Sequence, residues 1–213
     1  MPTEPLLHLI SRAEALLDRL ESVLPTPLAA PDWSAAIAFR YRRRGASGAI
    51  TPVRHVADIR LNSLVEVEPQ KERLLRNTRQ FVEGFGANNV LLTGARGTGK
   101  SSLIKACLNE FADRGLRLIE VDKTDLVDLP DIVDLVAERP ERFIVFCDDL
   151  SFDEGEPGYK ALKSILDGSV AAASDNVLVY ATSNRRHLMP ETMRENLAST
   201  YDENGELHPG EAV

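Results

Sequence analysis

A glycine-rich segment near the middle of the chain combines residue types that together suit a phosphate group. Gly94, Gly99, Lys100 and Ser101 fit the pattern G-x-x-x-x-G-K-[ST]. Glycines let the backbone wrap an anion with its N–H groups pointing inward, and the lysine adds a positive charge beside the β- and γ-phosphates. The serine hydroxyl suits Mg²⁺. The pattern predicts a nucleotide-phosphate site made of Gly94, Ala95, Arg96, Gly97, Thr98, Gly99, Lys100, Ser101 and Ser102.

The residues on either side of this loop have the order that such a site requires. Val90 to Leu92 is a short apolar run typical of a buried strand, and apolar residues recur at helical spacing from Leu103 to Phe111. A helix that starts at the loop directs the positive end of its dipole toward the anion. The glycine spacing does not fit G-x-G-x-x-G, which excludes the dinucleotide-binding fingerprint.

A second apolar run, residues 143–147, ends in the acids Asp148 and Asp149. Acids at the carboxyl end of a central parallel strand lie at the ligand-binding edge of the sheet. The run therefore fits the second motif of phosphate-loop proteins, Walker B. We expect Asp148 to bind Mg²⁺ opposite Ser101, and Asp149 to act as the general base that polarises the attacking water.

The role of the second acid leaves alternatives open, because aspartate is one methylene shorter than glutamate. Asp149 reaches the water after a small backbone adjustment, or Asp153 or Glu154 in the next loop contributes. A structural or Mg²⁺-binding role for Asp149 is the other alternative. Asn184 follows a further apolar run, and its amide suits a hydrogen bond to both the γ-phosphate and the attacking water. Capping of the next turn is the alternative for Asn184.

The rest of the core alternates apolar runs with amphipathic segments, which predicts a parallel sheet covered by helices on both faces. The predicted strands are 89–93, 116–121, 143–147 and 177–181, and the predicted helices are 71–82, 100–113, 129–137 and 159–166. The fold class is therefore a three-layer α/β/α phosphate-loop core with a parallel central sheet. We assign residues 59–198 to this core, 1–58 to a helical extension and linker, and 199–213 to a polar, mobile tail.

The extension begins with an amphipathic pattern over residues 5–24, whose apolar residues are spaced alternately by four and three. This predicts a helix that packs on its own domain or, alternatively, contacts another subunit. Pro25 to Pro31 form a linker, and a second helix is expected over Asp32 to Arg43. The basic cluster Arg40 to Arg44, with Tyr41 interleaved, could contact nucleic acid. The alternative is a solvated or salt-bridging patch.

Composition limits the function classes. The net charge of −8 argues against a protein that coats nucleic acid along its whole surface. Two cysteines, Cys107 and Cys147, are expected to be buried free thiols in a reducing compartment. A signal peptide and an apolar run of membrane-spanning length are both missing from the sequence, so we expect a cytoplasmic protein without a membrane partner.

The motifs in this order resemble the AAA+ ATPases, and most closely the uncharacterised bacterial AAA+ family catalogued as domain of unknown function 815. The residues that carry the resemblance are Val67-Glu-Pro-Gln-Lys71, Ala87-Asn-Asn-Val-Leu-Leu92, Gly94 to Ser102, Cys147-Asp-Asp-Leu-Ser-Phe152, Gly158-Tyr-Lys-Ala-Leu-Lys163 and Ala181-Thr-Ser-Asn-Arg-Arg-His187. The resemblance implies ATP and Mg²⁺ as ligands, Asn184 as sensor 1 and a homo-oligomer assembled through the core. It also implies that Leu64 and Val65 flank the adenine. No N-K-x-D motif for guanine is present.

One departure from the family pattern bears on activity. AAA+ domains continue past sensor 1 with a fifth core strand and a helical lid, and this chain stops near where those begin. The lid is therefore expected to be absent. Arg185, Arg186 and Arg194 are the only arginines after sensor 1, and none is assigned as an arginine finger. We expect slow hydrolysis, because an arginine supplied in trans contributes orders of magnitude to the rate.

Two functions fit these features. The first is an ATPase that hydrolyses ATP with Mg²⁺, with Lys100, Asp149 and Asn184 as its catalytic residues, to drive or gate remodelling of a macromolecular partner. The alternative is a nucleotide-gated binding module with little hydrolysis of its own. A small-molecule kinase would need an acceptor pocket and a phosphoryl-clamping lid, for which the sequence gives no sign.

Overall fold

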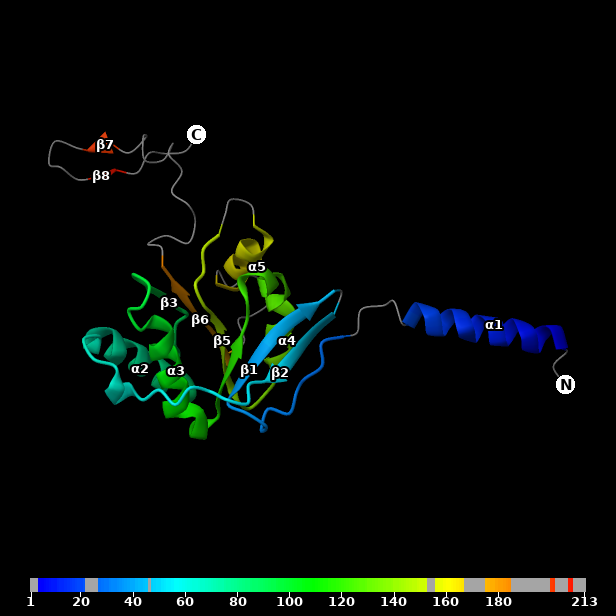
Figure 1. Ribbon diagram of the computed structural model, residues 1–213, viewed down its shortest axis with the longest axis horizontal. Coiled ribbons are helices and arrows are strands. Elements are labelled where there is room, and N and C mark those ends of the chain that lie inside the picture. The colour runs from blue at the N-terminus through cyan, green and yellow to red at the C-terminus, as the bar shows by residue number, and fades with distance from the viewer. Residues whose placement is uncertain are drawn as a thin grey trace.

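A six-stranded sheet forms the centre of the structure, a computed structural model that describes residues 4–21, 27–45, 47–152, 156–166, 175–184, 200–201 and 207–208 (Figure 1). The strands lie in the order β2-β1-β4-β5-β6-β3. Their bounds are Ala38–Arg44 for β1, Ser47–Pro52 for β2, Val90–Thr93 for β3, Leu116–Glu120 for β4, Arg142–Cys147 for β5 and Val177–Ser183 for β6.

Five of these strands are parallel. Strands β1, β4, β5, β6 and β3 pair in parallel across the sheet, and β2 pairs antiparallel with β1 at one edge. The sheet is therefore mixed, whereas the sequence predicted a parallel one. The difference is local, because a two-strand hairpin needs no crossover helix and can extend a parallel sheet at its edge.

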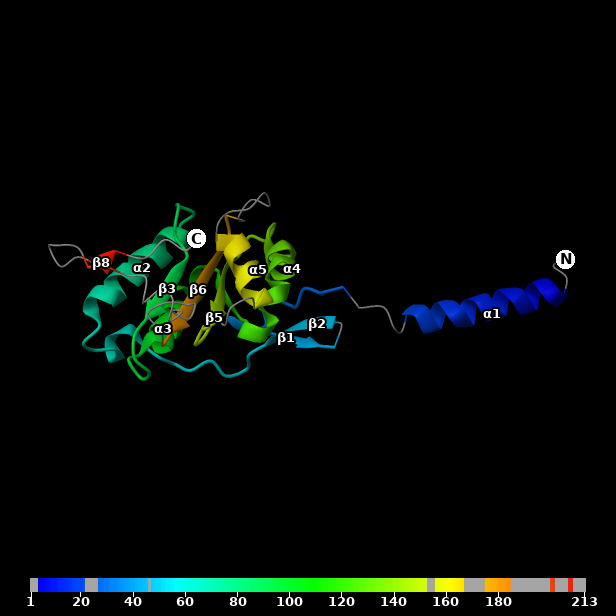
Figure 2. The same cartoon turned by 90° about the horizontal axis from the view of Figure 1, so that it is seen from above.

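Helices cover both faces of the sheet, which confirms the predicted three-layer fold (Figure 2). Helices α2 (Glu68–Val82) and α3 (Lys100–Phe111) pack on one face. The other face is covered by the 3₁₀ segment η3 (Lys123–Asp128) and by helices α4 (Leu129–Val136) and α5 (Pro157–Leu166). Of two shorter 3₁₀ turns, η1 (Leu61–Ser63) precedes α2 and η2 (Ala112–Arg114) follows α3.

Strand β5 shows why the layers form. Phe143, Val145 and Cys147 belong to the apolar cluster under α4 and α5, and Ile144 and Phe146 belong to the cluster under α2 and α3. Side chains alternate between the two faces of a strand, so a continuous apolar run must be buried on both sides. The strand places its carboxyl end, and the acids that follow it, at one edge of the core.

The helix predicted over Asp32 to Arg43 is wrong. Residues 38–44 form β1, which pairs in parallel with β4, and residues 47–52 form β2. Phe39 and Tyr41 are buried in the core, and the charge of Arg40 is balanced by Glu120 of β4, with Arg40 Nη2 2.7 Å from Glu120 Oε2. The segment assigned by sequence to a helical extension therefore contributes two strands to the central sheet.

One helix and one pair of strands lie outside the three layers. Helix α1 (Glu4–Glu21) confirms the predicted N-terminal helix, and in both views it stands apart from the sheet and its covering helices (Figures 1 and 2). Strands β7 (Thr200–Tyr201) and β8 (Leu207–His208) pair with each other inside the segment predicted as a polar tail. Within the described residues, no helix is long and apolar enough to span a bilayer.

Candidate nucleotide-binding site

The glycine-rich loop connects β3 to α3 and folds as its sequence predicts. Gly97 and Gly99 adopt left-handed backbone angles, with φ of 84° and 82°, which residues with a Cβ rarely adopt. Helix α3 begins at Lys100, and Leu103 N–H donates to the carbonyl of Gly99 at 2.8 Å. The amino end of the helix therefore lies at the loop, where its free N–H groups and its dipole favour an anion.

Lys100 links the loop to the end of strand β6. Its Nζ donates to the carbonyl oxygens of Gly94 and Ala95, both at 2.8 Å, and to Asn184 Oδ1 at 2.9 Å. The lysine is therefore held over the loop, between the glycine backbone and the residue predicted as sensor 1. An ammonium group in this position can bind a phosphate oxygen and remain within reach of the Asn184 amide.

Ser101 and Asp148 form the predicted pair across the cleft. Ser101 Oγ donates to Asp148 Oδ1 at 2.6 Å, and the same carboxylate oxygen accepts a hydrogen bond from Thr182 Oγ1, also at 2.6 Å. Thr182 is buried at the end of β6, next to β5 in the sheet. The threonine thus fixes the orientation of a carboxylate that stands directly opposite the serine hydroxyl.

Asp149 faces the same cleft as Asp148 because its backbone is left-handed, with φ of 53°. In a continuing strand the two carboxylates would point to opposite faces. The turn is secured by the Asp149 N–H, which donates to Thr182 Oγ1 at 2.8 Å. Asn184 Nδ2 donates to Asp149 Oδ1 at 2.6 Å. One amide therefore bridges Lys100 and Asp149.

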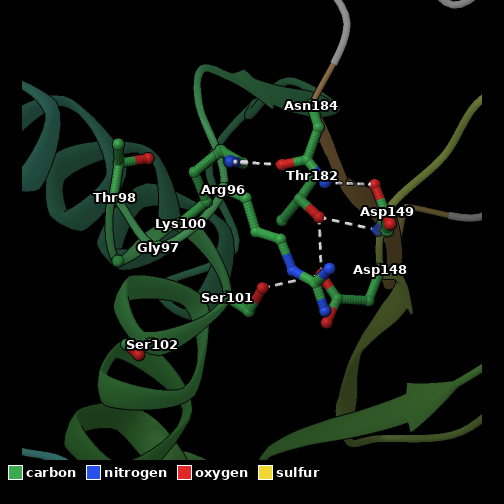
Figure 3. A pocket seen from close by; sticks show the side chains of 11 residues that line it. Arg96, Gly97, Thr98, Lys100, Ser101, Ser102, Asp148, Asp149, Thr182 and Asn184 are labelled. Atoms are coloured by element: carbon green, nitrogen blue, oxygen red, sulfur yellow. Dashed lines mark hydrogen bonds between the residues drawn. The ribbon is translucent and has the colours of Figure 1, made fainter.

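These residues surround a cleft of about 300 Å³ (Figure 3). The side chain of Arg96 extends from the loop across this cleft and points toward Asp148 (Figure 3). Two cations, Arg96 and Lys100, thus face two carboxylates, Asp148 and Asp149. The structure brings together the residues predicted as catalytic and metal-binding and most of those predicted to bind phosphate, and it adds Thr182. Gly94 and Ala95 contact Lys100 through their carbonyls but do not line this cleft. The lining residues are Arg96, Gly97, Thr98, Gly99, Lys100, Ser101, Ser102, Asp148, Asp149, Thr182 and Asn184.

A second hollow, of about 630 Å³, adjoins the loop and shares Thr98, Gly99 and Lys100 with the cleft. Its wall includes apolar side chains of α2, β3 and α3, and two amides, Gln70 and Asn77. Such a mixture of apolar surface and a few polar groups is typical of a pocket for an organic ligand. Among the described residues its lining includes Val67 but neither Leu64 nor Val65, the two residues expected beside the base.

The basic cluster of β1 lies outside both hollows. Tyr41 is only 3% exposed, and its hydroxyl donates to Asp128 Oδ2 at 2.8 Å, so its ring is not available to stack on a base. Arg43 Nη1 lies 3.6 Å from Asp128 Oδ1, and Arg40 is paired with Glu120. These contacts favour the salt-bridging alternative over a nucleic-acid interface.

Thr182 is a residue of the candidate site that the sequence analysis did not single out. The motifs indicated Asn184 but gave Thr182 no role. The signal was the spacing of two, which puts both side chains on the same side of a strand. Asp153 and Glu154, the alternative acids, lie outside the described residues, and so do Arg185, Arg186 and Arg194.

The arrangement is similar to parts of larger solved structures. These include the RuvB Holliday junction branch migration motor of Thermotoga maritima (17% identity, TM-score 0.45, 65% of this chain and 45% of that one). PCH-2 of C. elegans is also similar, with 20% identity and a TM-score of 0.45 over 67% of this chain and 43% of that one. AMPPCP-bound DnaA of Aquifex aeolicus has 15% identity and a TM-score of 0.43 over 66% of this chain and 48% of that one. The chain thus spans about half the length of these proteins. Among curated proteins none matches it.

A family match covers most of the chain. The family described as "Protein of unknown function (DUF815)" matches residues 34–213, a range that begins just before β1 and contains every residue of the cleft. It is the family that the motifs of the sequence resemble. The chain therefore belongs to the DUF815 family, and its core is a phosphate-loop α/β fold.

Proposed function

We propose that this protein is an AAA+ ATPase that binds ATP with Mg²⁺ in the cleft and hydrolyses it to drive or gate remodelling of a macromolecular partner. The observation that carries the proposal is the connected set of contacts from Lys100 through Asn184 to Asp149, beside the Ser101–Asp148 pair. Three separate sequence motifs supply these residues, and a purely structural loop would not require them to converge.

The donor set of Ser101 and Asp148 fits Mg²⁺. Both residues offer oxygen atoms, the ligands that this hard cation prefers, and Ser101 Oγ and Asp148 Oδ1 are 2.6 Å apart. Mg²⁺ bound there would neutralise charge that develops on the β- and γ-phosphate oxygens. Thr182 keeps Asp148 turned toward Ser101, and Lys100 offers its ammonium group to the phosphates.

Asp149 is the group we assign as general base, with Asn184 as its positioning residue. The hydrogen bond from Asn184 Nδ2 directs the Asp149 carboxylate into the cleft, at the end where Lys100 also lies. There the carboxylate can accept a proton from an attacking water. Asn184 can exchange its bond to Lys100 for one to the γ-phosphate, which would couple phosphate occupancy to the position of the base.

The second hollow supports a nucleoside as the remainder of the ligand. It meets the cleft at Thr98, Gly99 and Lys100, so a nucleotide whose phosphates lie on the loop can extend into it. Apolar side chains such as Leu74 and Leu103 can cover a base, and Gln70 can bond its polar edge. We propose adenine because the AAA+ resemblance implies ATP.

The alternative function, a nucleotide-gated binding module, is favoured by one observation. Asp149 has the shorter acidic side chain, and its carboxylate is already bonded to Asn184 at 2.6 Å. While Asp149 is held in this way, ATP hydrolysis is slow unless Asn184 exchanges its hydrogen bond to Asp149 for another. Assembly through the core into a homo-oligomer belongs to the ATPase proposal, because a neighbouring copy could add charge at the γ-phosphate.

The test is calorimetry with MgATP, followed by a phosphate-release assay. Wild-type protein should release or absorb heat that saturates with MgATP, and Lys100→Ala should remove this heat. Lys105→Ala, one turn further along α3 and outside the cleft lining, is the matched control and should bind normally. Identical heats for wild type and Lys100→Ala would refute nucleotide binding in the cleft.

Hydrolysis is tested on the same samples. Asp149→Asn should bind MgATP at least as tightly as wild type, because it removes a negative charge from the cleft, and should release no phosphate above background. Phosphate release by wild type that Asp149→Asn abolishes supports the ATPase proposal. Saturable binding with background release in both proteins supports the nucleotide-gated module instead. Normal release by Asp149→Asn would show that another group is the base.

A further inference from the structure

Helix α1 presents a row of exposed apolar side chains that nothing in the nucleotide site explains. Leu9, Ile10, Leu16 and Leu17 are 66%, 45%, 54% and 57% exposed. They are four of the eight large apolar side chains that are exposed in the described part of the chain. Isolated exposed leucines are ordinary, but four on one helix of 18 residues form a continuous surface of the kind that marks an interaction site.

These side chains form one stripe along the helix. At roughly 100° of rotation per residue, Leu9, Ile10, Leu16 and Leu17 all lie within about 60° of the direction of Ala13. Residues 6, 10, 13, 17 and 20 follow the spacing of four and three that keeps a seam facing a partner helix. A partner with its own helical seam therefore fits this surface better than a flat or irregular one.

The charges beside the stripe differ between its two sides. Arg12 and Arg19 lie roughly 100–120° from the stripe's centre in one direction, and Glu14 and Asp18 lie roughly 100–140° away in the other. One flank of the helix is therefore basic and the other is acidic. This asymmetry determines how two copies of the same helix can meet.

Two orientations of identical helices can be compared. In a parallel assembly, the flank on one side of each helix faces the opposite flank of its neighbour, so Arg12 and Arg19 meet Glu14 and Asp18. In an antiparallel pair each flank meets its own kind, and like charges repel. The charge pattern therefore favours parallel self-association over antiparallel.

We propose that α1 is a self-association element that packs in parallel against the α1 helices of other copies of this chain. A ring with cyclic symmetry places the same helix of every copy in the same direction, as this contact requires. An anionic membrane surface fits less well, because the sequence of the helix holds four acids, Glu4, Glu14, Asp18 and Glu21, against two arginines. The contact does not involve the cleft and does not depend on nucleotide.

Sedimentation equilibrium of the full chain without nucleotide tests the proposal. Wild type should associate as its concentration rises from about 5 to about 200 µM, a range suited to a contact of fewer than three heptads. Ile10→Gln with Leu17→Gln keeps good helix formers but removes the apolar seam, and should raise the dissociation constant at least about tenfold. Ala15→Gln, on the opposite side, should associate as wild type does. A wild type that stays monomeric, or a seam variant that associates normally, would overturn the proposal.

Charge exchange distinguishes a second copy from any other partner. Glu14→Arg with Asp18→Arg makes both flanks basic, and Arg12→Glu with Arg19→Glu makes both acidic. Each variant alone should associate more weakly than wild type, and an equimolar mixture should recover a mixed species. If α1 packs instead on its own core, on a lipid surface or on an unrelated protein, mixing would have no effect, and the proposal would fail.

Disulfide trapping tests the orientation. Ile10→Cys should form a covalent dimer on mild oxidation, because parallel copies bring residue 10 of each chain together. Cys107 and Cys147 are fully buried and should not compete. Ala15→Cys, on the exposed back of the helix, is the control and should not be trapped. If Ile10→Cys is trapped only when mixed with Leu17→Cys, the helices are antiparallel and the parallel contact is wrong.

Discussion

The charge of Arg96 should affect how much more tightly the cleft binds MgATP than MgADP. With Arg96 and Lys100 facing Asp148 and Asp149, the formal charges of the four side chains cancel. Without Arg96 the cleft keeps a net negative charge, which opposes MgATP more than MgADP because MgATP carries one more negative charge. We expect Arg96→Ala to weaken MgATP binding at least about tenfold and MgADP binding less, as calorimetry would measure.

Arg96→Lys separates charge from geometry. Lysine keeps the positive charge but cannot make two parallel hydrogen bonds to a phosphate or a carboxylate, so this variant should recover only part of the affinity for MgATP. Equal losses of ATP and ADP affinity in Arg96→Ala would show that the arginine shapes the loop and does not contact the terminal phosphate.

Thr182 is the residue that connects the two carboxylates. Its hydroxyl donates to Asp148 and accepts the Asp149 N–H, so Thr182→Val leaves a backbone donor unpaired and lets Asp148 turn away from Ser101. We expect a loss of about 1–3 kcal/mol in the free energy of unfolding. We also expect a higher Mg²⁺ concentration for half-maximal nucleotide binding, measured by titrating the metal at fixed ATP.

Ser183→Ala is the matched control for Thr182→Val. Ser183 is also buried, and its hydroxyl donates to the Leu150 carbonyl at 2.7 Å. It does not line the cleft. The variant should lose stability without a change in its Mg²⁺ requirement. If both variants shift the Mg²⁺ requirement equally, Thr182 acts through general stability and not through Asp148.

At the scale of elements, the strands and helices of the core could be predicted where an apolar pattern is followed directly by residues that end an element. Strands β3, β5 and β6 are apolar runs, and glycines or acids directly after β3 and β5 indicate their ends. Helix α3 follows from its 3.6-residue spacing. Apart from Thr182, the residues that line the candidate site could therefore be picked out in advance, because they lie next to these boundaries.

Strand β1 could not be predicted because its stability comes from distant contacts. Its sequence, Ala-Phe-Arg-Tyr-Arg-Arg-Arg, is dense in charge. Arg40 is paired on β4 with Glu120, which lies opposite it in the sheet but 80 residues away in sequence. The turn at Asp149 is a similar case, since Thr182 of another strand fixes it.

The contact between Tyr41 of β1 and Asp128 of η3 predicts a pH dependence of stability. Burial, and then the hydrogen bond to the Asp128 carboxylate, raise the pKa of Tyr41 above its usual value. A folded-state pKa above the unfolded value of about 10 stabilises the fold fully below that pH, and the stabilisation is lost as pH rises further. The free energy of unfolding should therefore fall above pH 10.

Tyr41→Phe measures how much of the alkaline loss of stability comes from Tyr41. It should reduce the free energy of unfolding by about 1–2 kcal/mol at pH 8, through the lost hydrogen bond. Its stability should then fall less steeply than that of wild type above pH 10, so that the two urea-denaturation series converge. Series that remain parallel through this range would place the alkaline loss at other groups, such as the buried Tyr180.

At the scale of the whole molecule, the site and the core share the same strands. Strands β4, β5 and β6 contribute alternate side chains to both apolar clusters, so neither helical layer can separate without exposing the sheet. The carboxyl ends of β3, β5 and β6 also hold the loop, the acids and Asn184. A ligand that bridges these ends should therefore stabilise both layers together.

The two cysteines, one in each apolar cluster, can show whether the two helical layers open together. Cys107 of α3 lies in one cluster and Cys147 of β5 in the other, and both are fully buried. Burial raises the pKa of each thiol to about 12, so neither forms a reactive thiolate while it is folded. A thiol-reactive probe in mild urea should therefore label both cysteines at the same rate, which is the rate of global opening.

With MgATP at about 100 times its dissociation constant, the added stability of about 2.7 kcal/mol should slow both labelling rates about 100-fold. Lys100→Ala should show no such protection. Protection of Cys107 without Cys147 would mean that the layers open separately and that nucleotide stabilises only the layer that carries the loop.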